Sequence, residues 1–285
     1  MLRRSATCIM AMVPLGWICL CPIDQARAEP AVVMLAPHRA VYDFSLTETR
    51  GHPAVLDVVG RMVYELTGSA CQGYGEKLRI VTQITNDEGE ATVADESSWT
   101  WEGAGGKRFR FKSSEVRNGK PVGDSEGEAV RADDAGSIAV ELTRPDKKAF
   151  MLPAQAYFPT QHTIALLTAA RMGRASLGAD IYDGSEQGEK VYHTVSSIGA
   201  SLARDTHQQL ASVANAERLQ QLDAWPIRVA YFDPKSDKED AVPAYEIRSV
   251  FFENGVNREL VIDYGSFAME GKLKEITFFE PTKCQ

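Results

Sequence analysis

The stretch KRFRFK at residues 107–112 decides the fold class, because apolar and basic side chains alternate in it from Arg108 onward. Its two phenylalanines share one parity, whereas Arg108, Arg110 and Lys112 share the other. Successive side chains of a β-strand point to opposite faces, so the stretch predicts a strand with one buried and one solvated face. Such strands are typical of antiparallel sheets, which can leave one face in water.

Seven further segments mix apolar and β-branched residues with polar ones at a similarly short period. They are RAVYDFSL (39–46), LDVVGRMVYEL (56–66), EKLRIVTQI (76–84), PIRVAYF (226–232), YEIRSVFF (245–252), NRELVIDY (257–264) and LKEITFFE (273–280). Turn signals such as Asn118-Gly119 and Asn254-Gly255 separate strands, because both residue types tolerate a positive φ. About twelve strands are predicted in all. The fold class is therefore mainly β, a large antiparallel sheet that curls or closes, since long open edges promote aggregation.

Two segments break the β pattern and predict one or two helices. We predict an amphipathic helix over residues 158–173, with Thr160 as its N-cap and Gly173 as its stop. Its apolar face is formed by Ile164, Leu167 and Met172. A second helix is predicted over residues 207–226, although an asparagine and a β-branched valine weaken it. Pro226 would end that second helix.

A secretory signal peptide is indicated at residues 1–28. The pair Arg3-Arg4 precedes an apolar run, and Ala26-Arg27-Ala28 supplies small residues at −3 and −1 of a cleavage site. A transmembrane anchor is the alternative, but Pro14 interrupts the run, which is shorter than the roughly 20 apolar residues that a span requires. We therefore predict export, with cleavage after about Ala28 and no transmembrane span.

The five cysteines divide into two groups. Cys8, Cys19 and Cys21 would leave with the signal peptide, whereas Cys71 and Cys284 remain in the mature chain. In an oxidising compartment an even pair predicts one disulfide. A free thiol, or a bridge between two chains, is the alternative. The disulfide would tie the C-terminus back to the N-terminal third of the protein.

Charge and length narrow the classes of protein that remain. The chain carries 31 basic and 39 acidic residues, and removing residues 1–28 leaves 28 against 38, a net charge of −10. Such an acidic chain is poorly suited to nucleic acid, because each phosphate contact needs Lys or Arg. No linker, repeat or low-complexity segment divides residues 29–285. We therefore predict a single domain over residues 29–285.

The search for catalytic or metal-binding patterns gives no candidate. The histidines are His38, His52, His162, His193 and His207. None has a Cys or His partner at metal-ligand spacing, and His162 is expected at the surface of the predicted helix. No G-x-S-x-G elbow is present, and GAGGK at residues 103–107 is typical of a hairpin turn. The acidic stretch DPKSDKEDA at residues 233–241 lacks the glycine of a calcium loop and indicates a solvated loop. The sequence therefore predicts no enzyme, cofactor or metal.

Three blocks of the mature chain resemble the envelope-integrity protein B (EipB) family of alphaproteobacterial periplasms. They are LAPHRAVYDFSL (35–46), YDGSEQGEKVYHTVSSIG (182–199) and AWPIRVAYFD (224–233), and Cys71 and Cys284 match in addition. The resemblance covers essentially the whole mature chain. It implies a broken, spiral-shaped β-barrel with a helix at a central cavity, an internal disulfide, a periplasmic location and a role in envelope maintenance. It also implies a partner carrying tetratricopeptide repeats, and no enzymatic activity.

The family motif can be carried over to eight positions, each of which also has a purely structural interpretation. They are Pro37, His38, Arg39, Tyr42, Asp183, Gly184, Trp225 and Pro226. In the structural interpretation Arg39 pairs with a carboxylate and Tyr42 lies in the core. Asp183-Gly184 would form a hairpin turn, and Trp225-Pro226 would act as helix stop and core anchor.

Three functions from different classes follow. The first is a periplasmic scaffold that maintains envelope integrity through a protein partner. The second is a carrier or sensor that holds a lipid or other amphiphile inside the curled sheet, since barrels of this size can enclose one ligand. The third is a hydrolase of envelope polymers, which the lack of a nucleophile or metal motif disfavours.

Overall fold

The computed structural model describes residues 32–51, 54–132, 136–204, 210–233 and 242–284. The predicted signal peptide at residues 1–28 lies outside the described residues. So do His52, His207 and all but Asp233 of the acidic stretch 233–241.

One antiparallel sheet contains all the named strands of the described residues, and it has fourteen strands where about twelve were predicted. The strands are β1 His38–Thr49, β2 Val55–Ser69, β3 Gly73–Asn86, β4 Ala91–Glu102, β5 Arg108–Arg117, β6 Lys120–Arg131, β7 Ser137–Arg144, β8 Lys148–Pro153, β9 Ser176–Ile181, β10 Tyr192–Ile198, β11 Ala224–Phe232, β12 Tyr245–Phe252, β13 Asn257–Asp263 and β14 Phe267–Phe278. The named helices of the described residues are one α-helix, α1 Pro159–Arg171, and the short 3₁₀ helices η1 Ala104–Gly106, η2 Glu186–Gly188 and η4 Glu217–Gln221.

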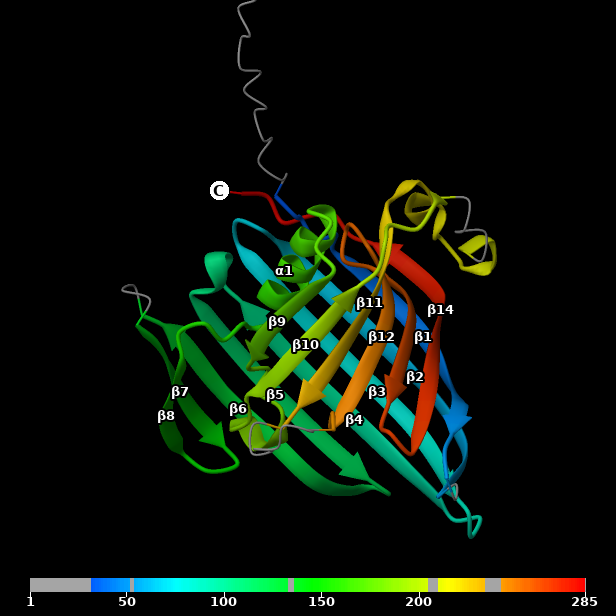
Figure 1. Ribbon diagram of the computed structural model, residues 1–285. Helices are drawn as coiled ribbons and strands as arrows, with labels where there is room; N and C mark the ends of the chain where they lie inside the picture. The colour runs from blue at the N-terminus through cyan, green and yellow to red at the C-terminus, as the bar shows by residue number, and fades with distance from the viewer. Residues whose placement is uncertain (1–31, 52–53, 133–135, 205–209, 234–241, 285) are drawn as a thin grey trace, which may run out of the picture.

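The sheet is a meander with one long-range pairing. Strands that follow one another in the chain pair, except β8 and β9, and the first strand β1 also pairs with the last strand β14. The order then ends at β8 on one side and at β9 on the other, so the sheet curls without closing into a barrel (Figure 1). The prediction of a mainly β protein with a large, curled antiparallel sheet is confirmed.

The stretch KRFRFK forms the start of β5 with the predicted facing. Phe109 and Phe111 are buried, and Phe109 stacks on Phe158 at the start of α1 with ring centroids 4.8 Å apart. Arg108 and Arg110 are exposed, and each donates to Glu128 on the neighbouring strand β6. The alternation therefore separates the core from a solvated outer face, as the pleat of a strand requires.

Helix α1 spans the connection between the two ends of the sheet. Its N-cap is Phe158, not Thr160 as predicted, and Thr160 is buried in the first turn. Thr160 is not needed as a cap, because a side chain from β4 takes that role. The carboxyl oxygens of Glu102 accept hydrogen bonds from the N–H groups of Thr160 and Gln161. No described helix is both long and apolar enough to cross a membrane.

The far end of α1 agrees with the sequence prediction only in part. Gly173 has a φ of +67° just after the helix, the conformation that favours glycine at a helix stop. Leu167 is fully buried as predicted. Met172, however, is exposed. The buried residues of α1 include Leu166, Ala169 and Ala170, which pack into a hydrophobic cluster with strand residues, and Met172 lies outside this cluster.

The second predicted helix is wrong in its described part. Residues 210–222 form 3₁₀ turns and an isolated bridge instead of an α-helix. Asn215 adopts a φ of +63°, and Ala214 pairs in parallel with Glu275 of β14, so tertiary pairing overrides the helix propensity of the segment. Trp225 and Pro226 therefore do not stop a helix. They lie in β11, where Trp225 is buried in the same hydrophobic cluster as Leu166 and Leu167 of α1.

Candidate functional site

The inner face of the curled sheet encloses a cavity of about 830 Å³. One wall comes from β2, β3 and β4, and the opposite wall comes from β12, β13 and β14 (Figure 1). Ten apolar side chains line it: Met62, Leu78, Ile80, Ile84, Ala94, Ile247, Leu260, Ile262, Phe267 and Met269. Along each strand, apolar residues that face inward alternate with polar residues that face outward. The residues that line the cavity are the inward-facing ones.

The cavity is continuous with the main hydrophobic core. The segment 210–222 fills one end of the curled sheet, where Leu210, Ala216 and Leu219 are completely buried and belong to the same cluster as Ile276 of β14. Leu78, Ile84, Leu260 and Ile262 lie at the margin of that cluster and also line the cavity. The cavity is therefore the part of the apolar inner face that no side chain of the described residues fills.

Four tyrosines gather at the end of β10, β11 and β12 beside this cavity. Tyr231 and Tyr245 stack with ring centroids 4.4 Å apart and an interplanar angle of 14°. Tyr192 meets both rings edge-on, at 5.8 and 5.7 Å. Tyr264 lies 6.4 Å from Tyr245, and these two tyrosines line the cavity directly. Loss of surrounding water is the main cause that raises their pKa values, and it raises the pKa of Tyr264 to about 12 although this side chain stays 44% exposed.

Two carboxyl groups share the same end of the cavity. Asp183 lines it, and burial raises the pKa of this side chain above its ordinary value. Its charge is close enough to Tyr231 and Tyr245 to raise their pKa values too. Glu96 on β4 also lines the cavity, and its pKa is raised first by the loss of surrounding water and then by the nearby carboxylate of Glu115. This end of an otherwise apolar chamber is therefore acidic and aromatic.

The motif residues Asp183 and Gly184 lie in the ten-residue connection of the β9–β10 hairpin, residues 182–191. Asp183 accepts the N–H of Ser185 at 2.9 Å, and the hydroxyl of Ser125 on β6 donates to the Gly184 carbonyl at 2.6 Å. Gly184 has a φ of +72°, and a Cβ there would lie 2.3 Å from the ring of Phe111. The glycine thus lets the connection press against β5 and hold Asp183 at the cavity.

The motif residues at the start of β1 lie away from the cavity. His38 is buried, its Nδ1 is 2.7 Å from the Ala36 carbonyl oxygen, and burial lowers its pKa. Arg39 lies 3.9 Å from Glu275, and the hydroxyl of Tyr42 donates to the Asn257 carbonyl at 2.7 Å. The carbonyl of Pro37 accepts the N–H of Phe279. None of the four is among the residues that line the cavity.

A disulfide joins two cysteines of the described residues. Cys71, in the turn between β2 and β3, pairs with Cys284, and the two Cα atoms are 5.8 Å apart. Hydrogen bonds flank the bridge, from the Thr282 N–H to the Gly68 carbonyl at 3.2 Å and from the Gln72 side chain to the Lys283 carbonyl at 2.8 Å. The C-terminal tail is thereby held across the β2–β3 turn.

Two of the remaining histidines have environments that the sequence did not indicate. His162 was expected at the surface, but it is only 5% exposed, because the first turn of α1 packs inward; burial lowers its pKa to about 4. His193 on β10 lies 2.9 Å from Asp180 on β9, at the rim of a cavity of about 530 Å³. Within the described residues, no group of three or more His, Cys, Asp or Glu side chains is arranged to hold a metal ion.

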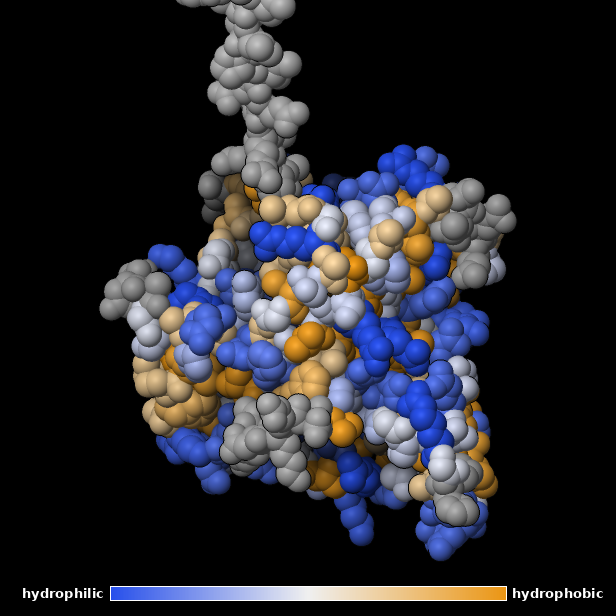
Figure 2. Space-filling model, in the orientation of Figure 1, coloured by the Kyte–Doolittle hydropathy of each residue, from blue (hydrophilic) through white to orange (hydrophobic). Residues whose placement is uncertain are grey.

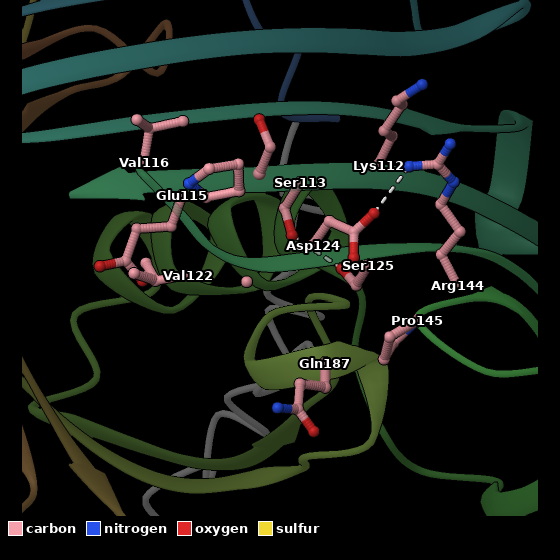
Figure 3. A pocket seen from close by; sticks show the side chains of 13 residues that line it. Lys112, Ser113, Glu115, Val116, Val122, Asp124, Ser125, Arg144, Pro145 and Gln187 are labelled. Atoms are coloured by element: carbon pink, nitrogen blue, oxygen red, sulfur yellow. Dashed lines mark hydrogen bonds and ion pairs between the residues drawn. The ribbon is translucent and has the colours of Figure 1, made fainter. Parts of the chain in front are cut away.

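A further cavity, of about 540 Å³, lies beside the β5–β6 hairpin. Figure 3 shows Gln187 across from the strand residues Ser113 and Ser125, with the ion pair between Arg144 and Asp124 at its rim. That pair measures 2.7 Å, so both charges are already compensated. This cavity combines hydrogen-bonding groups with the apolar side chains of Val116, Pro121, Val122 and Pro145.

Comparison with known proteins identifies the family. The EipB-like family model matches residues 29–280. The chain is 33% identical over 259 residues to the cell envelope integrity protein EipB of Brucella abortus (strain 2308), covering 90% of this chain and 89% of that protein. It also matches the crystal structure of a beta-barrel-like protein of a domain of unknown function from Brucella abortus, with a TM-score of 0.79, 32% identity, and coverage of 87% of this chain and 100% of the other. The chain belongs to the EipB-like family.

Proposed function

We propose that this protein works in the periplasm, without catalysing a reaction, to maintain the cell envelope, and that it does so by holding an amphiphile inside the curled sheet. The envelope role is supported by the name of the Brucella relative, a cell envelope integrity protein. The periplasmic location is supported by the signal-peptide pattern at residues 1–28 and by the pairing of the two mature-chain cysteines.

The apolar cavity is the observation that carries this proposal. Its volume of about 830 Å³ falls within the roughly 300–1,000 Å³ of small-molecule sites, and ten apolar side chains line it. Its lining also has a polar part, where Tyr245 and Tyr264 lie next to each other, Asp183 acts on Tyr245 and Glu96 acts on Tyr264. The other polar lining residues are Thr82, Asn86, Glu90, Thr92 and Arg117. An amphiphile has the matching division, an apolar chain and one polar head. Transfer of each methylene group of that chain from water would contribute about 0.8 kcal/mol.

A hydrolytic role is less well supported by the same chamber. The titratable groups that line it are carboxyl groups, tyrosines and Arg117, and none of the lining residues within the described chain is a histidine or a cysteine. The exposed contact between His193 and Asp180 lies in a different cavity. A serine–histidine pair of the kind that activates a nucleophile is therefore not formed at the apolar chamber.

Filling the cavity tests the proposal. Ala94→Trp places a bulky side chain in the chamber from β4, whereas Val93→Trp places the same residue on the exposed outer face of the same strand. We expect wild type and Val93→Trp to bind dodecyl maltoside below its critical micelle concentration in isothermal titration calorimetry. Ala94→Trp should lose this binding. Equal binding by both variants would refute the proposal, and so would a wild type that binds neither dodecyl maltoside nor a charged dodecyl amphiphile.

A scaffold for a periplasmic tetratricopeptide-repeat protein is the second candidate. The sheet ends at β8 and β9. The outer edge of β9 is partly occupied by a parallel bridge to Tyr157, whereas β8 has no strand beyond it among the described residues. Such an edge can accept an added strand. Figure 2 shows hydrophobic residues gathered over the β7–β8 end of the molecule, where Met151 is 60% exposed.

The edge can be tested separately from the cavity. Met151→Lys should weaken capture of a tetratricopeptide-repeat protein from the same periplasm and leave dodecyl maltoside binding intact. Val195→Lys, on the exposed face of the inner strand β10, is the matched control. Equal capture by both variants would show that the edge of β8 is not where the tetratricopeptide-repeat protein binds.

A further inference from the structure

The acidic and aromatic end of the cavity indicates which head group it accepts. Tyr245 and Tyr264 line that end, and Tyr245 belongs to the stacked group formed with Tyr231 and Tyr192. The carboxyl groups of Asp183 and Glu96 lie at the same end. Cations are attracted both to the faces of aromatic rings and to carboxylates, and aromatic cages with a nearby acid are a recurrent means of binding ammonium groups.

The positive charges near this part of the molecule are already paired. Lys190 lies 4.4 Å from the ring of Tyr192 and forms ion pairs with Glu186 and Asp233. Among the described residues that line the cavity, Arg117 is the single cationic side chain. Its guanidinium is already paired with Glu115 at 2.5 Å. An anionic head group would therefore lie beside two carboxyl groups without an uncommitted cation to balance it, which is unfavourable in a partly desolvated chamber.

We propose that Asp183, Glu96, Tyr245 and Tyr264 bind a positively charged head group, a quaternary or primary ammonium, while the apolar walls hold its chain. The protein would then select cationic single-chain amphiphiles over anionic ones of the same length. This inference rests on the proposed amphiphile-binding function, and it adds the chemical class of the ligand. It also gives Asp183 a role beyond that of a turn residue.

The surroundings of the two carboxyl groups fit this selection. Asp183 is partly buried and Glu96 is exposed, yet the loss of surrounding water raises the pKa of both, so the chamber disfavours their negative charge. A cation bound nearby favours the ionised form of the same groups. The attraction between ligand and site is strong in such an environment because water does not screen it fully.

Three dodecyl amphiphiles with different heads test the selection on the exported protein. They are dodecyltrimethylammonium, dodecyl maltoside and dodecyl sulfate, each titrated below its critical micelle concentration. We expect the trimethylammonium compound to bind at least about tenfold more tightly than the sulfate, the difference expected from one favourable cation contact. The uncharged maltoside should fall between them.

Two conservative variants assign the effect to the named carboxyl groups. Asp183→Asn retains an oxygen that can accept the Ser185 N–H, so the connection should keep its conformation. It should weaken trimethylammonium binding about tenfold and leave maltoside binding unchanged, and Glu96→Gln should act in the same direction. Glu141→Gln, an exposed carboxylate on β7, controls for the loss of one charge anywhere on an acidic protein.

The possible failures are distinguishable. If dodecyl sulfate binds as tightly as the ammonium compound, the head-group inference is wrong and amphiphile binding stands. The same conclusion follows if Asp183→Asn and Glu96→Gln both behave like Glu141→Gln. If none of the three compounds binds, or if Ala94→Trp leaves their binding unchanged, the proposed function itself fails and the inference with it.

Discussion

Removal of the Cys71–Cys284 bridge should destabilise the exported protein measurably. The bridge closes a loop with a sequence separation of 213 residues. Chain-entropy estimates give about 5 kcal/mol for a loop of this length, and native disulfides typically contribute roughly 2–5 kcal/mol. For a protein of this size, 1 kcal/mol corresponds to about 2–4 °C in Tm. Cys284→Ser should therefore lower Tm by about 4–20 °C, with the far-UV circular dichroism spectrum preserved.

The assay compares wild type, Cys284→Ser and the double variant Cys71→Ser/Cys284→Ser by differential scanning calorimetry without reductant. The double variant excludes artefacts of the thiol that the single variant leaves free. Adding reductant should bring wild type down to the Tm of the double variant. Thiol labelling of denatured, unreduced wild type should give no adduct. Equal Tm values for wild type and the double variant without reductant would refute the reasoning.

Three further predictions concern individual buried residues. Gly184→Ala should lower the free energy of unfolding by more than about 2 kcal/mol, because a positive φ is combined with a clash against Phe111. The control Gly89→Ala, at a φ of +82° with open space around it, should lower it by about 1 kcal/mol. Equal losses in urea unfolding would contradict this reasoning. Burial and the neighbouring Glu76 raise the pKa of Glu102 to about 8 from an ordinary value of 4.5, so the folded state holds a proton that the unfolded state releases. The stabilisation by that proton is complete below pH 4.5 and lost as the pH rises to about 8. Urea unfolding free energies should fall across this window in wild type and be flatter in Glu102→Gln, and parallel curves would contradict the assignment. His38→Ala should reduce envelope function only as far as it reduces protein abundance or partner binding, because the His38 side chain is buried against Tyr64. A variant that is folded, abundant and partner-bound, yet as defective as a deletion strain, would indicate chemistry at His38 instead.

The period-2 pattern predicts the sheet well because it reports a strictly local property, the alternation of faces along a strand. KRFRFK has the facing that its parity indicates, and the curled sheet follows from the number of such segments. The second helix fails for a non-local reason. Ala214 pairs with β14 and Asn215 takes a positive φ, and neither is visible in a helical pattern of residues.

The candidate site was the hardest part to predict. Asp183 and Gly184 could be picked out through the family motif, and sequence reasoning assigned them to a hairpin turn. Their position at the cavity depends on Gly184 meeting Phe111 across the curl of the sheet, a contact between residues more than seventy positions apart. The alternation of residues along β12 is consistent with an inward-facing Tyr245. Alternation alone, however, does not tell whether side chains from the opposite wall fill the interior of the curled sheet. The two walls meet only in the folded structure.

Native mass spectrometry of the protein purified without detergent from its own periplasm tests the central claim most directly. If the cavity holds an amphiphile, wild type and Val93→Trp should carry a bound molecule that is released on collisional activation, and its isolated ion should contain an alkyl chain and an ammonium group. Ala94→Trp should give the mass of the polypeptide alone. A clean polypeptide mass for wild type, indistinguishable from that of Ala94→Trp, would contradict the account.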